Sequence, residues 1–584
     1  MRRDDLTQLF VNRAKPHGER LLRIQVDDAV RNVDDPSGLA PDNPPTEVTS
    51  SGVDAECQHA SISSRPSRPR EKFVQCRLVT ADPDVVVIGS GPNGLVAACT
   101  LARKGLRVRV LEANPRRPGG AVGSAELTLP GFVHDVGAGF FPFALLSPAF
   151  AEVQLARFGV SWAHARFDSC HPARDGSHAC VSRDPNDTMD HFGTPDDGAA
   201  WHALATHYAR IQKPVLDALL QPFPHLASLT SLGVADLYRL ARVFSSRGRR
   251  FSARHFRSEA ARRVLPALAL HADVGPDDAW GAGLGYLLGM IATTAGFPVP
   301  VGGAQTVTNA LVTLLERHGG RLDLGQRVTR VVVAGGRAVA VRTEQGDELA
   351  VRQGVLADTS APSLLLDLLQ PRDVPRWLAR RMQRLRNGWG VFKIDWALGA
   401  RVPWTVEAAR QSAVVHTGEH VDDLARFAQE VRAGRLPESL FLVIGQPSLA
   451  DPGRGPRNQH TLQAYTHVPA RIGRPWSHLR ESFADRIEQR IEELAPGFGH
   501  TVLDRRICTP DDLEMDNANL ISGSHLGGSA SWRHQLVWRP AFPYFRYRMP
   551  ARRLYLCSSY AHPGGGVHGM CGFNAARIAL RDFG

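Results

Sequence analysis

The stretch from Asp84 to Glu112, DVVVIGSGPNGLVAACTLARKGLRVRVLE, constrains the fold more than any other part of the chain. An apolar run leads directly into Gly89, Gly91 and Gly94, which have the G-x-G-x-x-G spacing. A segment with apolar residues at helical spacing follows, and a second apolar run then ends at Glu112. This order of strand, glycine turn, helix and strand predicts a unit that binds a dinucleotide.

Each part of this motif has a physical role in holding a pyrophosphate. The first glycine permits a tight turn, the second lets backbone approach the phosphates, and the third lets helix and strand pack closely. The helix is expected to begin around Pro92 and Asn93, where free N–H groups and a partial positive charge attract anions. A carboxylate at Glu112 would accept hydrogen bonds from ribose hydroxyls and repel a 2′-phosphate. A glycine-rich turn without a ligand is the alternative.

Two further glycine-rich segments are expected to contribute to the same site. Gly119 and Gly120 follow Arg117, so flexible backbone lies beside a cation near the expected pyrophosphate, although an ordinary loop is the alternative. At the far end, LYLCSSYAHPGGGVHGMCGFNAARIAL predicts a strand, a glycine-rich loop and a helix that begins near Gly569. The N-terminus of that helix would face an electron-rich group, such as the N1–C2=O edge of a flavin, and favour its reduced form.

Composition limits the classes of function. The 584 residues are 43% hydrophobic and 22% charged, which is typical of a globular chain with two domains and an extension. The net charge of +11 comes from arginines spread along the chain, and the sequence has no zinc-finger or RNP-like motif, so we expect no nucleic-acid partner. The eight cysteines form no C-x-x-C pair, so we expect neither a metal site nor dithiol chemistry, and a reducing compartment.

The sequence also bears on localisation. The first residues, MRRDDLTQLF, lack the apolar core of a signal peptide. The longest uncharged run, from Ala279 to Leu315, is broken throughout by Gly, Pro and Thr, unlike a membrane-spanning helix. We therefore expect a cytoplasmic protein. The basic stretch Arg239 to Arg263 would allow peripheral contact with anionic lipid, and a solvated helix face is the alternative.

In this order, the elements resemble the flavin-dependent phytoene desaturase/carotenoid isomerase family, a branch of the amine-oxidase-like FAD proteins. The matching elements lie from residue 82 onward and are GSGPNG (Gly89–Gly94), Glu112, the R-x-G-G element (Arg117–Gly120), HDVGAG (His134–Gly139), PVGG (Pro300–Gly303) and the closing YLCSSYAHPGGGVHGMCGFNAAR. The segments WGVFKIDWAL and HPGGGVHG are most similar to the branch named pyridine nucleotide-disulphide oxidoreductase domain-containing protein 2.

The resemblance implies non-covalently bound FAD, held by an α/β, Rossmann-like domain of the amine oxidase/phytoene desaturase type, and a mixed α+β substrate domain with a tunnel to the flavin. We expect a disordered extension over residues 1–80, the FAD-binding domain over 81–150, 300–375 and 536–584, and the substrate domain over 151–299 and 376–535. The strand around Val328 would give backbone contacts to the adenine. The expected FAD-binding residues are Gly89, Gly91, Pro92, Asn93, Gly94, Glu112, Arg117, Gly119, Gly120, Val328, Gly566, Val567 and Gly569.

The activity that the resemblance implies is that of an FAD-dependent oxidoreductase, which desaturates or isomerises a long apolar, polyene-like substrate by hydride transfer through flavin. The alternatives are an FAD-dependent amine oxidase, which needs an aromatic cage that the C-terminal loop does not supply, and a non-enzymatic interaction protein that retains FAD. The branch name mentions pyridine nucleotides, but no second G-x-G-x-x-G follows a strand in this sequence. We therefore expect no tightly bound NADH or NADPH, and electron transfer to oxygen, a quinone or another acceptor.

Few polar catalytic residues are expected, because the protein mainly supplies orientation and a dry pocket for flavin chemistry. His562 precedes Pro563 and the last glycine loop, where it would approach the flavin or substrate. A histidine that ties this loop by hydrogen bonds is the alternative, and His568 is a weaker candidate. Lys393 and Asp395 share one face of a predicted strand, and we expect them to form a surface ion pair.

Overall fold

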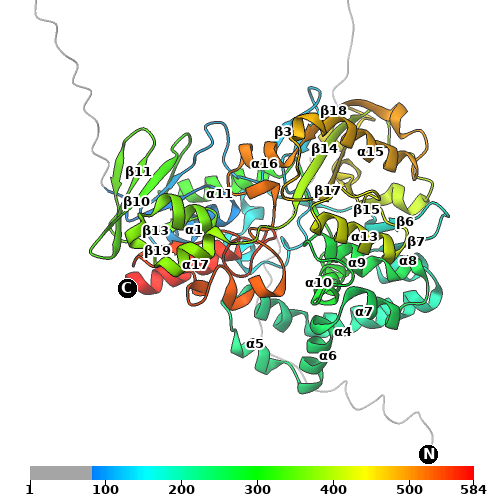
Figure 1. Cartoon of the computed structure of the whole chain (residues 1–584), viewed down its shortest axis with the longest axis horizontal. Coiled ribbons are helices and arrows are strands. Elements are labelled where there is room, and N and C mark those ends of the chain that lie inside the picture. The colour runs from blue at the N-terminus through cyan, green and yellow to red at the C-terminus, as the bar shows by residue number, and fades with distance from the viewer. Residues whose placement is uncertain (1–81) are drawn as a thin grey trace, which may run out of the picture. The chain divides into compact units, whose positions relative to one another are not determined.

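The computed structural model describes residues 82–584 (Figure 1). The extension expected over residues 1–80 lies outside the described residues. All the described elements belong to the second of two compact units, residues 79–584.

A five-stranded parallel sheet carries the first glycine turn. Its strand order is β19–β13–β1–β2–β9, and all four neighbouring pairs are parallel. The strands are β1 (Val85–Ile88), β2 (Val108–Leu111), β9 (Arg321–Asp323), β13 (Gly354–Ala357) and β19 (Leu554–Leu556). The side chains of β1, β13 and β19 are entirely buried, as expected for a parallel sheet covered on both faces. This topology confirms the predicted α/β class.

Three helices from distant parts of the sequence pack together beside this sheet. They are α1 (Pro92–Ala102), α11 (Gln305–Arg317) and α17 (Met570–Phe583). Helix α1 contacts both of the others, and Figure 1 shows the C-terminal α17 beside it. Ten of the eleven residues of α1 are buried, because the helix is enclosed between its neighbours.

Short antiparallel strands complete this part of the protein. The strands β10 (Val328–Ala334), β11 (Arg337–Thr343) and β12 (Glu348–Ala350) form a three-stranded sheet. The β10–β11 turn is made by Gly335 and Gly336, with φ of +57° and +70°, as a two-residue hairpin with both central residues left-handed requires. The strands β3 (Ser124–Glu126) and β4 (Val133–Asp135) form a separate hairpin, and β5 (Trp162–Ala163) pairs with β8 (Val299–Pro300).

A seven-stranded mixed sheet forms a second centre. Its order is β18–β14–β17–β16–β15–β6–β7, and only β15 and β6 pair in parallel. The strands are β6 (Phe167–Pro172), β7 (His178–Val181), β14 (Gly390–Leu398), β15 (Ser412–His416), β16 (Val443–Gly445), β17 (His460–Val468) and β18 (Val502–Cys508). All seven strands come from the two segments assigned to the substrate domain. The domain boundaries themselves stay a prediction, since the contacts group residues 79–584 as one unit.

The two faces of the seven-stranded sheet differ in character. On one face Phe392, Ile394 and Trp396 of β14 join an apolar core with helix α15 (Arg480–Glu492), which lies against the sheet in Figure 1. Because side chains alternate along a strand, Lys393 and Asp395 point to the opposite face. We call this opposite face the inner face of the sheet. It carries residues of the candidate site.

Residues 145–300 contain mainly helices, together with the strands β5–β8. Helix α4 (Pro195–Leu220) begins at a capping box formed by Thr194 and Asp197. The other helices of this segment are α2 (Pro148–Val153), α3 (Pro185–Asp190), α5 (Leu226–Ser231), α6 (Val234–Ser245), α7 (Gly248–His255), α8 (Glu259–Arg262), α9 (Val264–Leu270) and α10 (Gly281–Thr294).

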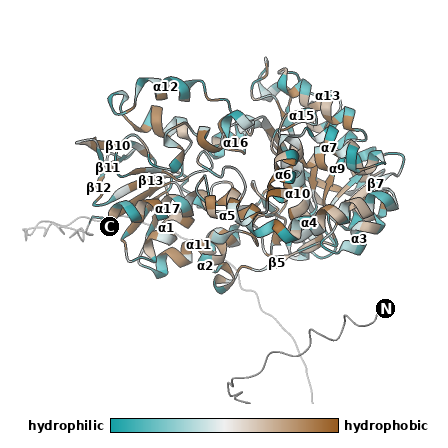
Figure 2. Ribbon diagram, turned by 90° about the horizontal axis from the view of Figure 1, so that it is seen from below, coloured by the Kyte–Doolittle hydropathy of each residue, from teal (hydrophilic) through white to brown (hydrophobic). Residues whose placement is uncertain are grey.

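The remaining helices lie between or after the strands of the seven-stranded sheet. They are α12 (Arg376–Gln383), α13 (Val421–Arg432), α14 (Pro447–Ala450) and α16 (Pro510–Asp516). Hydrophobic residues line the interior elements in Figure 2, whereas α12 lies at the periphery with hydrophilic residues along it. Over residues 82–584, none of the helices has both the length and the hydropathy needed to cross a membrane.

Candidate functional site

The first glycine turn connects β1 to α1 as predicted. Gly89 has φ of +91°, which favours glycine, and its N–H donates to the Leu111 carbonyl of β2 at 2.8 Å. A Cβ atom at Gly94 would lie 2.4 Å from the Gly89 carbonyl oxygen. A Cβ atom at Gly91 would lie 2.4 Å from a carboxylate oxygen of Asp358. All three glycines are therefore required by close packing around the N-terminus of α1.

Glu112 is held at the carboxyl end of β2, beside this turn. The Ser90 N–H and hydroxyl donate to one carboxylate oxygen of Glu112 at 2.8 and 2.6 Å, and the Asn114 N–H donates to the other at 2.8 Å. The side chain is half-buried. These bonds fix a carboxylate where the sequence predicted the ribose contact.

Asp358 is a site residue that the sequence analysis missed. It follows β13, the neighbour of β1, and its carboxylate accepts a hydrogen bond from the Gly94 N–H at 2.9 Å. Burial raises its pKa to about 7, and the negative charge of Glu112 contributes in the same direction. Its position directly after a buried strand could have identified it from the sequence, because ligands of parallel sheets bind at the carboxyl ends of the strands.

The second glycine segment lies against the first. The Gly119 N–H donates to the Ser90 carbonyl at 3.1 Å, and Gly119 and Gly120 have φ of +104° and +55°. A Cβ atom at Gly120 would lie 3.5 Å from the Cα of Gly91. Arg117 donates to the Gly120 carbonyl at 2.8 Å and pairs with Asp516 at 2.8 Å. The two turns thus form a cradle lined by backbone, with a guanidinium at its edge.

The C-terminal glycine loop leads into α17, whose first turn touches the first turn of α1. A Cβ atom at Gly572 would lie only 1.8 Å from the Asn93 carbonyl oxygen, so only glycine allows this approach. Gly569, with φ of +66°, is the N-cap of α17, and Gly566 has φ of +115°. Two helix N-termini therefore lie together, and both favour negative charge.

The start of β10 lies next to Glu112. The Gln326 N–H donates to the Glu112 carbonyl at 2.7 Å, and the Gly325 N–H donates to the Asn114 carbonyl at 3.3 Å. Val328 follows two residues later and is buried. These contacts bring the predicted adenine-binding strand to the predicted ribose-binding residue.

His562 lies in a position that suits the loop-tethering alternative. Its side chain is 3% exposed, and Nε2 lies within hydrogen-bonding distance of the Gln221 carbonyl, at 3.1 Å. Burial lowers its pKa to about 4, which keeps the ring neutral at pH 7. His568 accepts a hydrogen bond at Nδ1 from the Met570 N–H at 3.0 Å. A catalytic role for His562 stays a prediction.

The expectation of a surface ion pair at Lys393 and Asp395 was wrong. The two residues are 5% and 1% exposed and form a buried ion pair on the inner face of β14. His134, the central residue of β4, lies 3.8 Å from Asp395. Burial and the charge of Lys393 lower the pKa of His134 to about 3. The sequence showed the shared face of the strand but not that another part of the chain covers it.

The same inner face of the sheet carries an aromatic group that sequence reasoning did not find. Tyr465 of β17 stands directly opposite Lys393, and its hydroxyl lies 3.1 Å from Nδ1 of His271. Nε2 of His271 in turn lies 2.6 Å from Nε2 of His416. The Tyr465 ring packs at 5.8 Å against His525. These residues come from four distant segments, so no local spacing could have connected them.

His525, at the edge of this aromatic group, is exposed, and desolvation by the surrounding protein lowers the pKa of its ring. Tyr465 is half-buried. On the same face, Gln463 approaches the segment after β4, because a Cβ atom at Gly139 would lie 2.2 Å from Nε2 of Gln463. The inner face of the seven-stranded sheet thus faces the glycine-rich HDVGAG segment.

A buried arginine ties this sheet to the glycine-rich segments. Arg454 is fully buried and pairs with Asp135 at 2.5 Å and with Asp451 at 3.1 Å. Asp135 also accepts hydrogen bonds from the Ala304 N–H and the Ser124 hydroxyl, at 2.8 and 2.7 Å. The network fixes HDVGAG and PVGG against one another. Among residues 82–584, no cluster of three or more His, Cys, Asp or Glu side chains has an arrangement that could hold a metal ion.

The chain is similar to several known proteins over most of its length. The chain is 28% identical over 554 residues to pyridine nucleotide-disulfide oxidoreductase domain-containing protein 2 of Rattus norvegicus, covering 85% of this chain and 93% of the relative. It is 26% identical to a neurosporene-forming phytoene desaturase of Rhodobacter capsulatus, covering 83% and 91%. An oxidoreductase structure from Methanosarcina mazei shares the fold with a TM-score of 0.56, at 16% identity, covering 85% and 99%. The family of flavin-containing amine oxidoreductases matches residues 93–577, and the chain belongs to this family.

Proposed function

We propose that this FAD-dependent oxidoreductase desaturates or isomerises a long apolar, polyene-like substrate. The names of several relatives support the substrate class, since they include phytoene desaturases and a limonene dehydrogenase subunit. The observation that carries the proposal is an uncharged aromatic wall on the inner face of the seven-stranded sheet, formed by Tyr465, His271, His467 and His525. An apolar substrate that covers such a wall desolvates no ionised group, which would cost far more than covering neutral aromatic rings.

The side chains of this wall are neutral because burial suppresses their ionisation, and the neighbouring Lys393–Asp395 ion pair carries no net charge. The pKa of His271 is lowered to about 3, and that of His525 is also lowered, in both cases mainly by burial. Asp273 and His467 approach to 3.2 Å, and burial raises the pKa of Asp273 to about 8 while it lowers that of His467. At neutral pH these side chains therefore carry no net charge to bind a protonated amine.

The residues present fit FAD. The backbone of Gly89–Gly94 and Gly119–Gly120 would hold the pyrophosphate at the paired helix N-termini, with Arg117 at the edge of the cradle. Glu112 would bind the ribose, Val328 the adenine, and Gly566, Val567 and Gly569 the flavin. Bound FAD supplies hydride acceptance at N5.

Tyr465 and His271 are the hydrogen-bonding groups of the wall. The Tyr465 hydroxyl lies 3.1 Å from Nδ1 of His271, and burial raises the pKa of Tyr465 and lowers that of His271, so both side chains stay neutral. His416 extends the same hydrogen-bonded chain away from the wall. His562 remains the candidate from the C-terminal loop.

An amine oxidase is the second candidate, and one observation favours it. Tyr465, His467, His525 and Trp389 form a cluster of aromatic rings with centroids 5.5–5.8 Å apart. An amine oxidase needs an aromatic cage, and this cluster would supply one that the C-terminal loop lacks. A non-enzymatic protein that retains FAD is the third candidate.

Anaerobic mixing of the FAD-loaded protein with candidate polyenes and with amines separates the three. We expect bleaching of the flavin absorption by a polyene, with a new double bond or an isomer in the product. Bleaching by amines alone would establish the second candidate. A flavin that dithionite reduces but no candidate substrate bleaches would support the third. The variant Tyr465→Phe serves as the control for the wall, because it removes the hydroxyl and keeps the ring.

A further inference from the structure

A surface rich in arginine and free of carboxylates lies on α12 and on the segment 531–546. Neither residues 374–394 nor residues 517–581 contain an Asp or Glu. The exposed arginines of this surface are Arg376, Arg380, Arg384, Arg386, Arg533 and Arg546. Within residues 82–584, none of them has a carboxylate oxygen within 4.0 Å. We call α12, Arg384–Arg386 and residues 531–546 the arginine surface.

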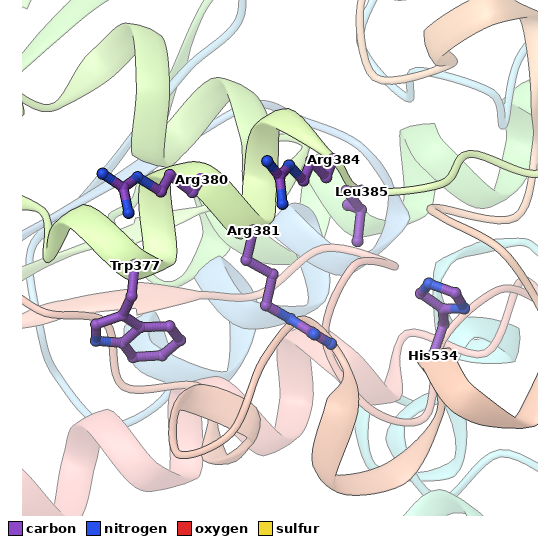
Figure 3. A pocket seen from close by; sticks show the side chains of 6 residues that line it. All are labelled: Trp377, Arg380, Arg381, Arg384, Leu385 and His534. Carbon is purple, nitrogen blue, oxygen red and sulfur yellow. The ribbon is translucent and has the colours of Figure 1, made fainter.

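A pocket opens on this surface (Figure 3). Its volume is about 310 Å³, and it is lined by Trp377, Arg380, Arg381, Arg384, Leu385 and His534. Arg381 reaches from α12 toward the facing segment, where it donates to the carbonyls of Trp538 and Pro540 at 3.2 and 3.3 Å. Its guanidinium is therefore held in place across the pocket.

The pocket has a positive potential. The pKa of His534 is lowered by burial and by the charges of Arg381, Arg386 and Arg539. The three arginine charges lower this pKa because they disfavour a further positive charge in the pocket. An anion that accepts several hydrogen bonds would be favoured, and guanidinium geometry suits phosphate.

Exposed aromatic side chains lie on the same surface, and one of them, Trp377, lines the pocket. Trp377, Trp532, Trp538 and Phe542 are 48%, 52%, 45% and 55% exposed. The Trp377 ring stacks on Tyr544 at 6.1 Å, and Arg381 lies 5.8 Å from the centre of the Trp538 ring. Large aromatic groups exposed next to cations are typical of surfaces that meet the headgroup region of a bilayer.

We propose that the arginine surface docks on a bilayer of anionic phospholipids, with the pocket of Figure 3 receiving a lipid phosphate. The arginines attract the anionic surface, and the tryptophans and Phe542 enter the headgroup region. This proposal is independent of the substrate.

The basic stretch that the sequence indicated, Arg239 to Arg263, is a weaker candidate for this contact. Arg249 pairs with Asp277 and Asp422, and Arg257 pairs with Asp196. Arg263 is buried and donates to backbone carbonyls. The remaining exposed arginines of the stretch 239–263, such as Arg239 and Arg242 on α6, provide a matched control surface.

Vesicle co-sedimentation of the FAD-loaded full chain tests the proposal without turnover. We expect binding to phosphatidylcholine vesicles that contain phosphatidylglycerol, weaker binding at high salt, and little binding to phosphatidylcholine alone. The double variant Arg380→Gln/Arg384→Gln should weaken binding roughly 25-fold, since each arginine near an anionic surface contributes about a factor of five. Arg239→Gln/Arg242→Gln should bind as the parent does, with flavin absorption unchanged in both.

Three outcomes would overturn the proposal. One is equal binding to neutral and anionic vesicles. Another is loss of binding in the α6 variant while the α12 variant still binds. The third is calorimetric binding of inorganic phosphate that depends on Arg380 and Arg384 without any vesicle binding, which would make the pocket a site for soluble phosphate compounds.

Discussion

The carboxylate of Asp358 accepts a hydrogen bond from the Gly94 N–H at 2.9 Å, at the N-terminus of the helix that is expected to face the pyrophosphate. A carboxyl group and a phosphate would therefore occupy neighbouring positions on one helix end. Their charges would repel if both were ionised, and burial already raises the pKa of Asp358 to about 7. The protonation of this residue should control cofactor affinity near neutral pH.

Replacing Asp358 by Asn should remove this control. The raised pKa means that the folded protein holds one proton more than the unfolded chain between about pH 4 and pH 7, so its stability falls as the pH rises through that window. Asp358→Asn keeps an acceptor for the Gly94 N–H but cannot ionise. We expect it to bind FAD with a weaker pH dependence between pH 6 and 8, and more tightly at pH 8, by fluorescence titration. An unchanged pH profile would contradict the assignment.

Gly91→Ala should lower the flavin content for a defined steric reason. The added Cβ atom would lie 2.4 Å from the Asp358 carboxylate. If that contact is the cause, Gly91→Ala/Asp358→Ala should regain part of the flavin measured by absorption after denaturation. Gly473→Ala is the matched control, because nothing lies within 4 Å of a Cβ atom there. Failure of the double variant to recover flavin would show that the backbone of Gly91 itself must approach the cofactor.

Removing the Arg454 charge alone should destabilise the protein more than removing the charges of Arg454, Asp135 and Asp451 together. Arg454→Met leaves Asp135 and Asp451 buried without their cation, which typically costs about 3–5 kcal/mol. The triple change Arg454→Met/Asp135→Asn/Asp451→Asn should cost less, because no uncompensated charge remains. Urea denaturation followed by circular dichroism gives both values. A larger loss in the triple variant would show that the ion pairs are net stabilising.

Nicotinamide cofactors should not reduce the flavin rapidly. The two segments expected to form the substrate domain, 151–299 and 376–535, contain Gly-x-Gly at Gly281–Gly283 and at Gly453–Gly455. Neither forms a strand-to-helix turn, because Gly281 and Gly283 lie within α10 and Gly453 lies in a short 3₁₀ helix (Pro452–Arg454). Neither arrangement offers a pyrophosphate site of the usual kind. Stopped-flow mixing with NADH or NADPH should show no fast bleaching. Rapid reduction at micromolar nicotinamide would require a binding site of another design.

The fold was predictable where one segment contains its own partners. The β1–α1–β2 unit, the β10–β11 hairpin and α17 all follow from local spacing and turn residues. The candidate site was predictable only for residues in the glycine motifs and for Glu112 and Val328, which belong to strands that the local sequence indicates. Asp358, Tyr465 and His271 are brought together by strand order and helix packing, which local patterns do not encode. The burial of Lys393 and Asp395 depends on the distant hairpin that carries His134, so their strand alone suggested a surface pair.

The contact between Gly572 and Asn93 has a consequence for biosynthesis. Helices α1 and α17 both contribute their N-termini to the candidate site. A nascent chain therefore exposes the apolar flank of α1 until residues 570–583 have left the ribosome. Such a long sequence separation slows assembly and leaves the incomplete protein open to aggregation and proteolysis. Stop codons just before α17 would therefore reduce the amount of protein in the cell, and cofactor supply could not rescue it.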